Sequence, residues 1–181
     1  MPPPATPRAP RRPVGRNANQ GVALALLFWT SAAGAVTPLA RAQDQPAERP
    51  PGLVLLVEKT SSQGPYSFGM FHPRPDPVQP SLWNVRIWQE VSDRVTVSSE
   101  RLNCDRRAPM RILRQGSNLE LRYLNPGGAL TPSNRLDHLL WWAVCHPSLA
   151  GRDPAGLGAE AQRLGFSGQL VERLEIVPAG R

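Results

Sequence analysis

Cysteine and histidine are scarce in this sequence of 181 residues, which contains only Cys104, Cys145, His72, His138 and His146. A zinc site needs three or four ligands within tetrahedral reach of one another. His138 and His146 lie on either side of the end of a predicted helix, and His72 lies in a proline-rich stretch. The sequence therefore predicts no metal site and no cofactor.

The patterns that mark common catalytic sites are also missing. The sequence contains no phosphate-binding glycine loop, no G-x-S-x-G motif, and no pair of carboxylates spaced for acid–base work. Asp137 and His138 are adjacent, but no nucleophile accompanies them to complete a relay. We expect no catalytic residues, and hence a protein that is not an enzyme.

Lysine occurs once, as Lys59, whereas arginine occurs 20 times, and the formal net charge is +7. The charge is unevenly distributed, because residues 1–42 contain five arginines and no acidic residue. Residues 43–181 carry 16 basic and 14 acidic side chains. The basic excess belongs mostly to the N-terminal segment, so it does not indicate a nucleic-acid partner.

The apolar run at 22–36 is about 15 residues long, and a membrane span needs roughly 20. A basic start, a short apolar run and the small residues Ala40 and Ala42 are together typical of a secretory signal peptide. We predict a signal peptide over 1–42, cleavage after Ala42, and no stable membrane span after cleavage. An uncleaved anchor is the alternative. The predicted location is outside the cytoplasm, in the periplasm or on the cell surface.

The rest of the chain reads as a flexible linker at 43–52, followed by a single domain at 53–181. Short β-rich or alternating segments predict strands over 53–59, 66–71, 84–91, 94–102, 110–114 and 118–124. The segment 170–177 fits a strand or a short helix, and we favour the strand. Leu119, Leu121 and Tyr123 alternate on one side of the segment 118–124. Short turns favour antiparallel pairing. Four prolines in 72–80 predict an irregular loop, and a change of apolar face near Ser99 predicts a bulge or a twist.

A helix is predicted to begin near Thr131 or Ser133, with Pro132 in its first turn, and to end at Cys145. It is apolar on nearly all sides, so it must be covered on two faces. The sheet supplies one cover, and the C-terminal segment or a partner subunit supplies the other. A loop is expected at 150–158 and a short helix at 159–164. The fold class is therefore α+β, an antiparallel sheet with one helix.

Two cysteines in an exported protein predict a disulfide between Cys104 and Cys145. Closing this loop of 41 residues contributes roughly 4 kcal/mol to stability by the chain-entropy relation. A catalytic thiol at Cys145 is the alternative, since His146 is adjacent to it. Neighbouring residues rarely place an imidazole where it can activate a thiol, so the disulfide is favoured.

Trp88 and Arg86 form the candidate binding surface. They fall on the face of the predicted strand 84–91 that is opposite to its apolar face. Trp88 is the best candidate for an exposed aromatic residue, and an exposed tryptophan can serve as a platform on which a sugar stacks.

Residues 83–145 resemble the surface-adhesin protein E family of proteobacterial exported proteins. The matching features are V-R-I-W at 85–88, S-S-E-R-L-N-C-D-R-R ending after Cys104, M-R-I-L at 110–113, and P-S-N at 132–134 opening a segment that closes on Val144-Cys145. The resemblance implies an antiparallel sheet, a disulfide-tethered helix and a role in binding rather than catalysis. The best-known member of that family binds host matrix proteins.

From these observations we expect an exported, non-enzymatic binding module of the cell envelope or cell surface, and the resemblance implies an adhesin-like function. Its partner would be a protein or another component of the host or the envelope. The alternative is a periplasmic structural or accessory subunit that buries the second face of the helix in a homodimer.

Overall fold

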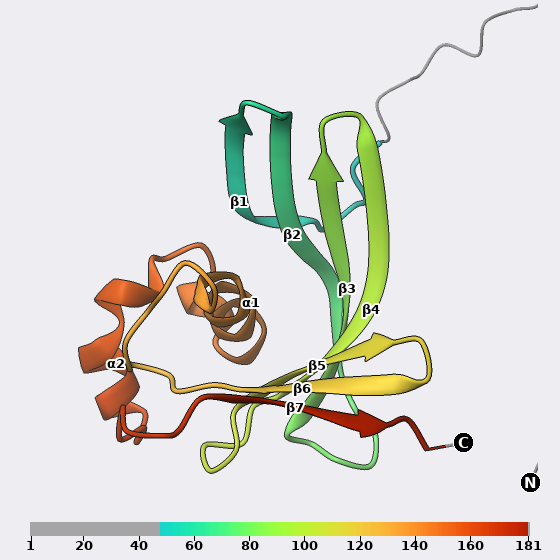
Figure 1. Ribbon diagram of the computed structural model, residues 1–181. Helices are drawn as coiled ribbons and strands as arrows, with labels where there is room; N and C mark the ends of the chain where they lie inside the picture. The colour runs from blue at the N-terminus through green and yellow to red at the C-terminus, as the bar shows by residue number, and fades with distance from the viewer. Residues whose placement is uncertain (1–47, 181) are drawn as a thin grey trace, which may run out of the picture. The chain divides into compact units, whose positions relative to one another are not determined.

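The computed structural model describes residues 48–180 and shows a seven-stranded antiparallel sheet with one principal helix against it (Figure 1). Neighbours in the sheet are neighbours in the sequence, from β1 to β7. The strands are β1 (Val54–Ser61), β2 (Gly64–Pro75), β3 (Leu82–Val91), β4 (Arg94–Asn103), β5 (Met110–Gln115), β6 (Asn118–Tyr123) and β7 (Arg173–Pro178). The predicted antiparallel α+β fold is confirmed, including the strand near the C-terminus. The predicted signal peptide lies outside the described residues.

The predicted loop at 72–80 was partly wrong, because β2 continues through its first prolines to Pro75. β1 pairs with β2 only as far as Met70, so the rest of β2 pairs with β3 alone. Proline is tolerated in such a position, since an edge strand needs no donor on its open side. The pairing shifts between Phe71 and Arg74, where His72 has a positive φ of 51°.

Of the bulge or twist predicted near Ser99, the bulge is wrong, because β3 and β4 keep one register over all ten residue pairs. The apolar residues change sides for another reason. Val97 lies opposite Trp88, on the face away from the helix, whereas Leu102 lies on the helix side and is fully buried. Val97 is 39% exposed, so it is an apolar residue on an open part of the sheet, and the alternation changes face without a bulge.

The principal helix, α1 (Arg135–Cys145), lies in the angle between strands β1–β4 and strands β5–β7 (Figure 1). Thr131 stabilises the turn that precedes α1. The Thr131 hydroxyl oxygen accepts from the Asn134 N–H, and the Thr131 carbonyl accepts from the Arg135 N–H. The helix itself begins four residues after Thr131. Asn134 precedes it in a helical conformation and makes no side-chain cap.

Every residue of α1 from Asp137 to Val144 is buried. The sheet covers one side, and the chain that follows the helix covers the other. This second cover includes two short 3₁₀ turns (Pro147–Leu149 and Pro154–Gly156), helix α2 (Gly158–Arg163) and the loop after it. Its buried core residues are Leu149, Leu157, Ala161 and Phe166. The helix therefore needs no partner subunit to bury its second face.

The predicted disulfide is present, and it links Cys104 after β4 to Cys145 at the end of α1, with 5.5 Å between the two Cα atoms. No cysteine in the described residues is free, so Cys145 offers no thiol for catalysis. The Trp141 indole N–H donates to the Asn103 carbonyl, 2.9 Å away, beside the disulfide. Together these contacts fasten the last turn of α1 to the end of β4. Within residues 48–180, no helix combines the length and apolar character needed to cross a membrane.

Candidate functional site: an arginine-lined groove

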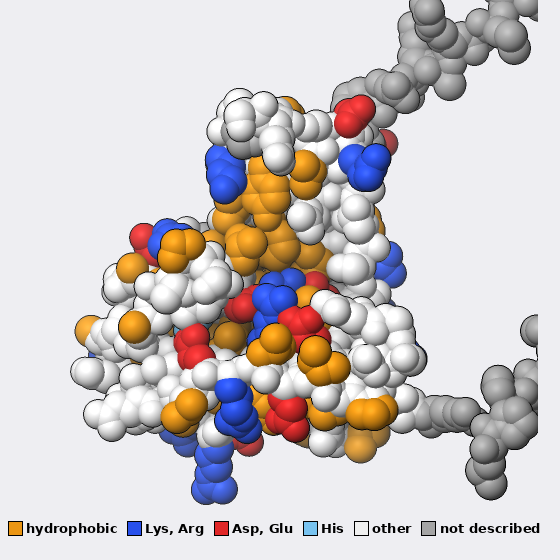
Figure 2. Space-filling model, in the orientation of Figure 1, with side chains coloured by type: hydrophobic (Ala, Val, Ile, Leu, Met, Phe, Trp, Pro, Cys, Tyr) orange, Lys and Arg blue, Asp and Glu red, His pale blue; other side chains and the backbone are white. Residues whose placement is uncertain are grey.

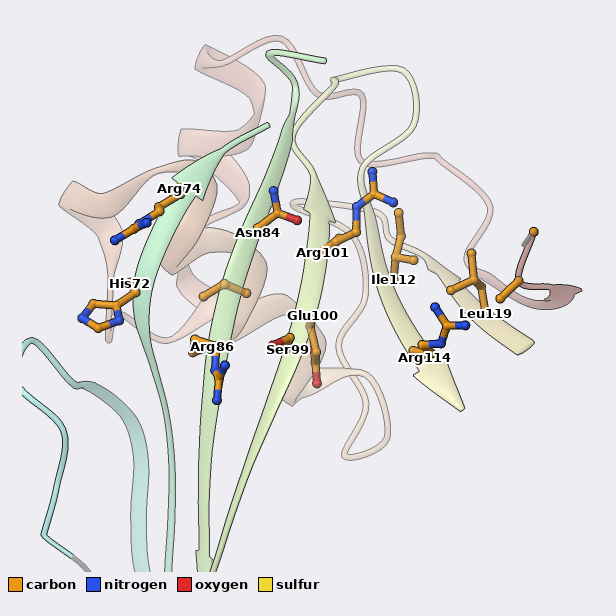
Figure 3. A pocket seen from close by; sticks show the side chains of 13 residues that line it. His72, Arg74, Asn84, Arg86, Ser99, Glu100, Arg101, Ile112, Arg114 and Leu119 are labelled. Carbon is orange, nitrogen blue, oxygen red and sulfur yellow. The ribbon is translucent and has the colours of Figure 1, made fainter. Parts of the chain in front are cut away.

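A fork in the sheet creates the candidate site. β3 and β4 pair over ten residues, but β4 and β5 pair only through Arg101–Ile112, Leu102–Arg111 and Asn103–Met110. Beyond the first of these pairs the two strands diverge, and a groove of about 700 Å³ opens on the face away from α1 (Figure 3). Strands β2 to β6 and the residues after β7 all contribute to its walls.

The groove is strongly basic. Arg74 comes from β2, Arg86 from β3, Arg101 from β4 and Arg114 from β5. Figure 3 shows these side chains around one opening, with Asn84 and Ser99 between them. Neighbouring strands in a sheet lie about 4.8 Å apart, so the four arginines, one from each strand, are spread across the strands rather than along one strand. Ile112 and Leu119 add apolar surface to the lining.

The arginines have little acidic compensation. Arg101 lies 3.8 Å from Asp76 and both are partly exposed, so this ion pair is weak. The Asp76 carboxylate accepts from the backbone N–H groups of Val78 and Gln79, which lower its pKa. Arg114 donates to a backbone carbonyl. Arg74 and Arg86 form no ion pair with any other residue of 48–180.

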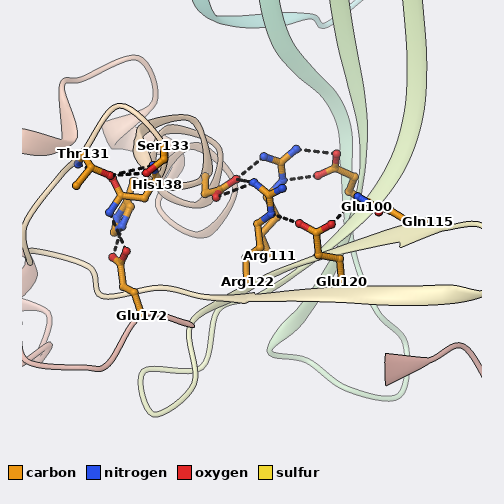
Figure 4. A network of polar contacts seen from close by, with 11 residues as sticks. Glu100, Arg111, Gln115, Glu120, Arg122, Thr131, Ser133, His138 and Glu172 are labelled. Atoms are coloured by element: carbon orange, nitrogen blue, oxygen red, sulfur yellow. Dashed lines mark hydrogen bonds and ion pairs between the residues drawn. The ribbon is translucent and has the colours of Figure 1, made fainter. Parts of the chain in front are cut away.

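Glu100 lines the groove but does not neutralise it, because its carboxylate is bound from the helix side of the sheet. Arg111 donates to both Glu100 oxygens, with Nε 2.6 Å from Oε2 and Nη2 2.7 Å from Oε1. Both side chains are buried, and the contact lies directly behind the fork (Figure 4). The cationic surface of the groove is therefore open to a ligand.

A buried ionic network extends this contact to α1. The third donor of Arg111 lies 2.5 Å from Asp137, and Arg122 donates to the same carboxylate from 3.2 Å (Figure 4). Arg122 also binds Glu120, which in addition accepts from Gln115. Burial acts to lower the pKa of Arg111, but the ion pairs with Glu100 and Asp137 outweigh it and raise that pKa. Arg111 therefore stays charged, and it joins β4, β5 and α1.

The structure separates the two residues of the predicted binding surface. Arg86 is exposed and lines the groove. Trp88 is only 3% exposed, so the expectation of an exposed aromatic was wrong. Trp88 does lie on the same face as Arg86, but opposite Gly69, where there is no side chain to keep the indole away from the strand. Arg49 also crosses this face, close to Ser67 and Glu90.

The three histidines lie apart. His72 is at the rim of the groove beside Phe71, with 5.1 Å between ring centroids. His138 is buried and its Nε2 lies 2.7 Å from Glu172. His146 packs among aromatic rings, and burial lowers its pKa. Residues 48–180 contain no group of three His, Cys, Asp or Glu side chains placed to hold a metal ion.

Sequence reasoning found Arg86 but missed Arg74, Arg101 and Arg114. The other three could have been found by asking which alternate residues of each strand share the face of Arg86. That requires the residue-by-residue pairing of each strand with the next. Arg74 lies opposite Asn84, and Asn84 lies opposite Arg101, so all three share one face. The register of β2 depends on an irregularity beside His72, which the sequence alone does not reveal.

No family model, curated protein or solved structure matches this chain. The resemblance to the surface-adhesin protein E family therefore stays a prediction.

Proposed function

We propose that the protein is an exported binding module of the cell envelope or cell surface, without catalytic activity, that holds an anionic group of its partner in the groove. The observation that carries this proposal is the set of four arginines, one from each of β2 to β5, around one groove with one weak acidic partner. An anionic ligand would supply the negative charge that the groove lacks.

The chemistry of the guanidinium group supports an anionic ligand. Its planar fork of N–H donors matches phosphate, sulfate and carboxylate groups, and it can bind them through two parallel hydrogen bonds. No aromatic side chain other than His72 lines the groove, so stacking on a sugar or base contributes little there. The ligand is therefore recognised mainly through its charge.

Two features support export. The disulfide between Cys104 and Cys145 is a bond that persists in oxidising compartments and is rare in the cytosol. The sequence of residues 1–42 has the pattern of a signal peptide. A partner in the envelope or on a host surface follows from this location, and an adhesin-like role agrees with the resemblance in residues 83–145.

Calorimetric titration tests the ligand. The probes are inorganic pyrophosphate and dextran sulfate, with neutral dextran as the uncharged comparison. We expect binding of both anionic probes, weakened by added salt. Replacing Arg74 and Arg86 together by alanine should weaken binding roughly tenfold or more, since one hydrogen bond to a charged group contributes about 1.5–3 kcal/mol.

Arg163→Ala is the matched control, because Arg163 is an exposed arginine on α2, outside the groove. It should bind like the original protein. Absence of binding to both anionic probes, or equal binding by the double variant, would contradict the proposal. Protease treatment of intact cells then distinguishes the cell surface from the periplasm, since only a protein on the surface is digested.

A periplasmic structural or accessory subunit that forms a homodimer is the second candidate. Helix α1 is covered within one chain, so it gives no reason to expect a homodimer. The observation that favours a homodimer is the open edge of β7.

A further inference from the structure

β7 is an exposed edge of the sheet with apolar side chains. Its only strand neighbour in the described residues is β6. Leu174 and Ile176 lie opposite Arg122 and Glu120 on the side of the sheet that faces α1, yet they are 58% and 61% exposed. Figure 2 shows hydrophobic and charged side chains side by side over this part of the molecule. Such an edge is a ready site for pairing with another strand.

The opposite edge, β1, carries features that prevent pairing. Its register with β2 shifts between Leu55 and Val57, which marks a bulge or irregularity. Glu58 and Lys59 are exposed, and Arg49 binds Glu58 with 2.7 Å between the charged atoms. Bulges and charged side chains are the usual protection of an edge strand. β7 also carries exposed charges, Arg173 and Glu175, and ends at Pro178, but it pairs with β6 without a shift over its whole length, so it lacks a bulge.

We propose that β7 pairs antiparallel with β7 of a second copy of this chain, about a two-fold axis at Leu174. In this register Arg173 faces Glu175 of the second copy, and Glu175 faces its Arg173. Leu174 meets its own equivalent, and Val171 meets Val177. Opposite charges thus face each other at 173 and 175, and apolar residues meet at 174 and at 171 with 177, whereas Glu172, which already binds His138, falls opposite Ile176. The matched pairs give the self-complementary surface that a two-fold dimer requires.

Other registers are less favourable. Moving the axis by one residue sets Arg173 against Arg173, or Glu175 against Glu175, and like charges directly opposite each other are destabilising. Neither residue forms an ion pair within 48–180, so both are available. The Arg173 guanidinium lies 3.5 Å from the centroid of the Tyr123 ring, which holds it on the face away from α1.

In the dimer the two sheets would join edge to edge, and a two-fold axis perpendicular to a sheet does not turn the sheet over. Both grooves would therefore open on the same face of the dimer. A polymeric anion could then occupy both grooves, and its apparent affinity would exceed that of a single site.

Sedimentation and light scattering over a wide range of concentration test this pairing on the purified protein with its disulfide intact. We expect a concentration-dependent dimer. Glu175→Arg replaces both cross-strand ion pairs by repulsive Arg–Arg pairs and should weaken the dimer roughly tenfold or more. The double variant Arg173→Glu, Glu175→Arg exchanges the charges and should restore dimerisation to within about threefold of the original.

Asp93→Arg is the control for a change of charge, because Asp93 lies exposed in the turn between β3 and β4. It should dimerise like the original protein. The proposal is overturned by a protein that stays monomeric at every concentration, by a Glu175→Arg variant that dimerises normally, or by a double variant no better than the single one. Anion binding by a monomer would leave the proposed function intact, so the two proposals fail separately.

Discussion

The Nη1 atom of Arg111 lies 2.5 Å from Oδ1 of Asp137, and this contact joins β5 to the first turn of α1 inside the protein. Both side chains are less than a tenth exposed. The other two donors of the guanidinium hold Glu100 behind the groove. One buried arginine thus connects the helix, the fork of the sheet and the wall of the candidate site.

Replacing Arg111 by alanine should lower the free energy of unfolding by about 3–5 kcal/mol, because it leaves the Glu100 and Asp137 carboxylates buried without their main partner. Arg111→Lys keeps one charge but not the forked geometry, so its loss should be intermediate. Chemical denaturation measures both variants. Arg114→Ala, at an exposed position, should stay within about 0.5 kcal/mol of the original. An Arg111→Ala variant of unchanged stability would show that the network contributes nothing.

Trp88→Ala should destabilise the protein by about 3–5 kcal/mol, because it removes a large side chain that is buried against the sheet. Trp88→Phe keeps most of the volume and should stay folded with anion binding intact, since Trp88 does not line the groove. Thermal unfolding and the pyrophosphate titration give the two readouts. If Trp88→Ala were neutral for stability but lost binding, Trp88 would be a contact residue after all.

Replacing Cys104 and Cys145 together by serine should cost about 4 kcal/mol of stability, because the bond closes a loop of 41 residues. Denaturant titration of the double variant measures this loss. Preparing the original protein in its reduced form gives an independent comparison without any substitution. Equal stability of the oxidised and reduced forms would mean that the core alone fixes α1 on the sheet.

Stability should fall in mildly acidic solution because of His146. Burial lowers its folded pKa below the ordinary value of 6.5, so the unfolded chain takes up a proton first as the pH falls. Neutral His146 makes its full contribution to the free energy of unfolding above about pH 6.5. This contribution is lost as the pH drops toward the pKa of His146 in the folded protein. His146→Gln should flatten this part of the stability curve measured by denaturation at several pH values. Identical curves for the two proteins would rule out His146 as the cause.

The strands and the helix could be predicted because their apolar patterns are local. The run at 53–59 and the 3.6-residue pattern before Cys145 both appear in the structure as β1 and α1. The extent of β2 depends on its pairing with β3 beyond the end of β1, and the burial of Trp88 involves Gly69 opposite it on β2. This information lies in the neighbouring strands, and a single strand does not contain it.

The buried charges were the main feature that could not be predicted. In 118–124 the alternation of Leu119, Leu121 and Tyr123 marks a half-buried face, but the opposite face, with Glu120 and Arg122, points toward α1. Charged residues normally indicate solvent. Here each one has a partner from another element, and such partners are known only once the fold is known.

The most direct test of the anion-binding groove is to follow the arginine side-chain N–H signals by nuclear magnetic resonance during a pyrophosphate titration. We predict saturable shifts for Arg74, Arg86, Arg101 and Arg114, with no shift for Arg163. Equal small shifts at all exposed arginines, or no shift in the four groove residues, would contradict the account.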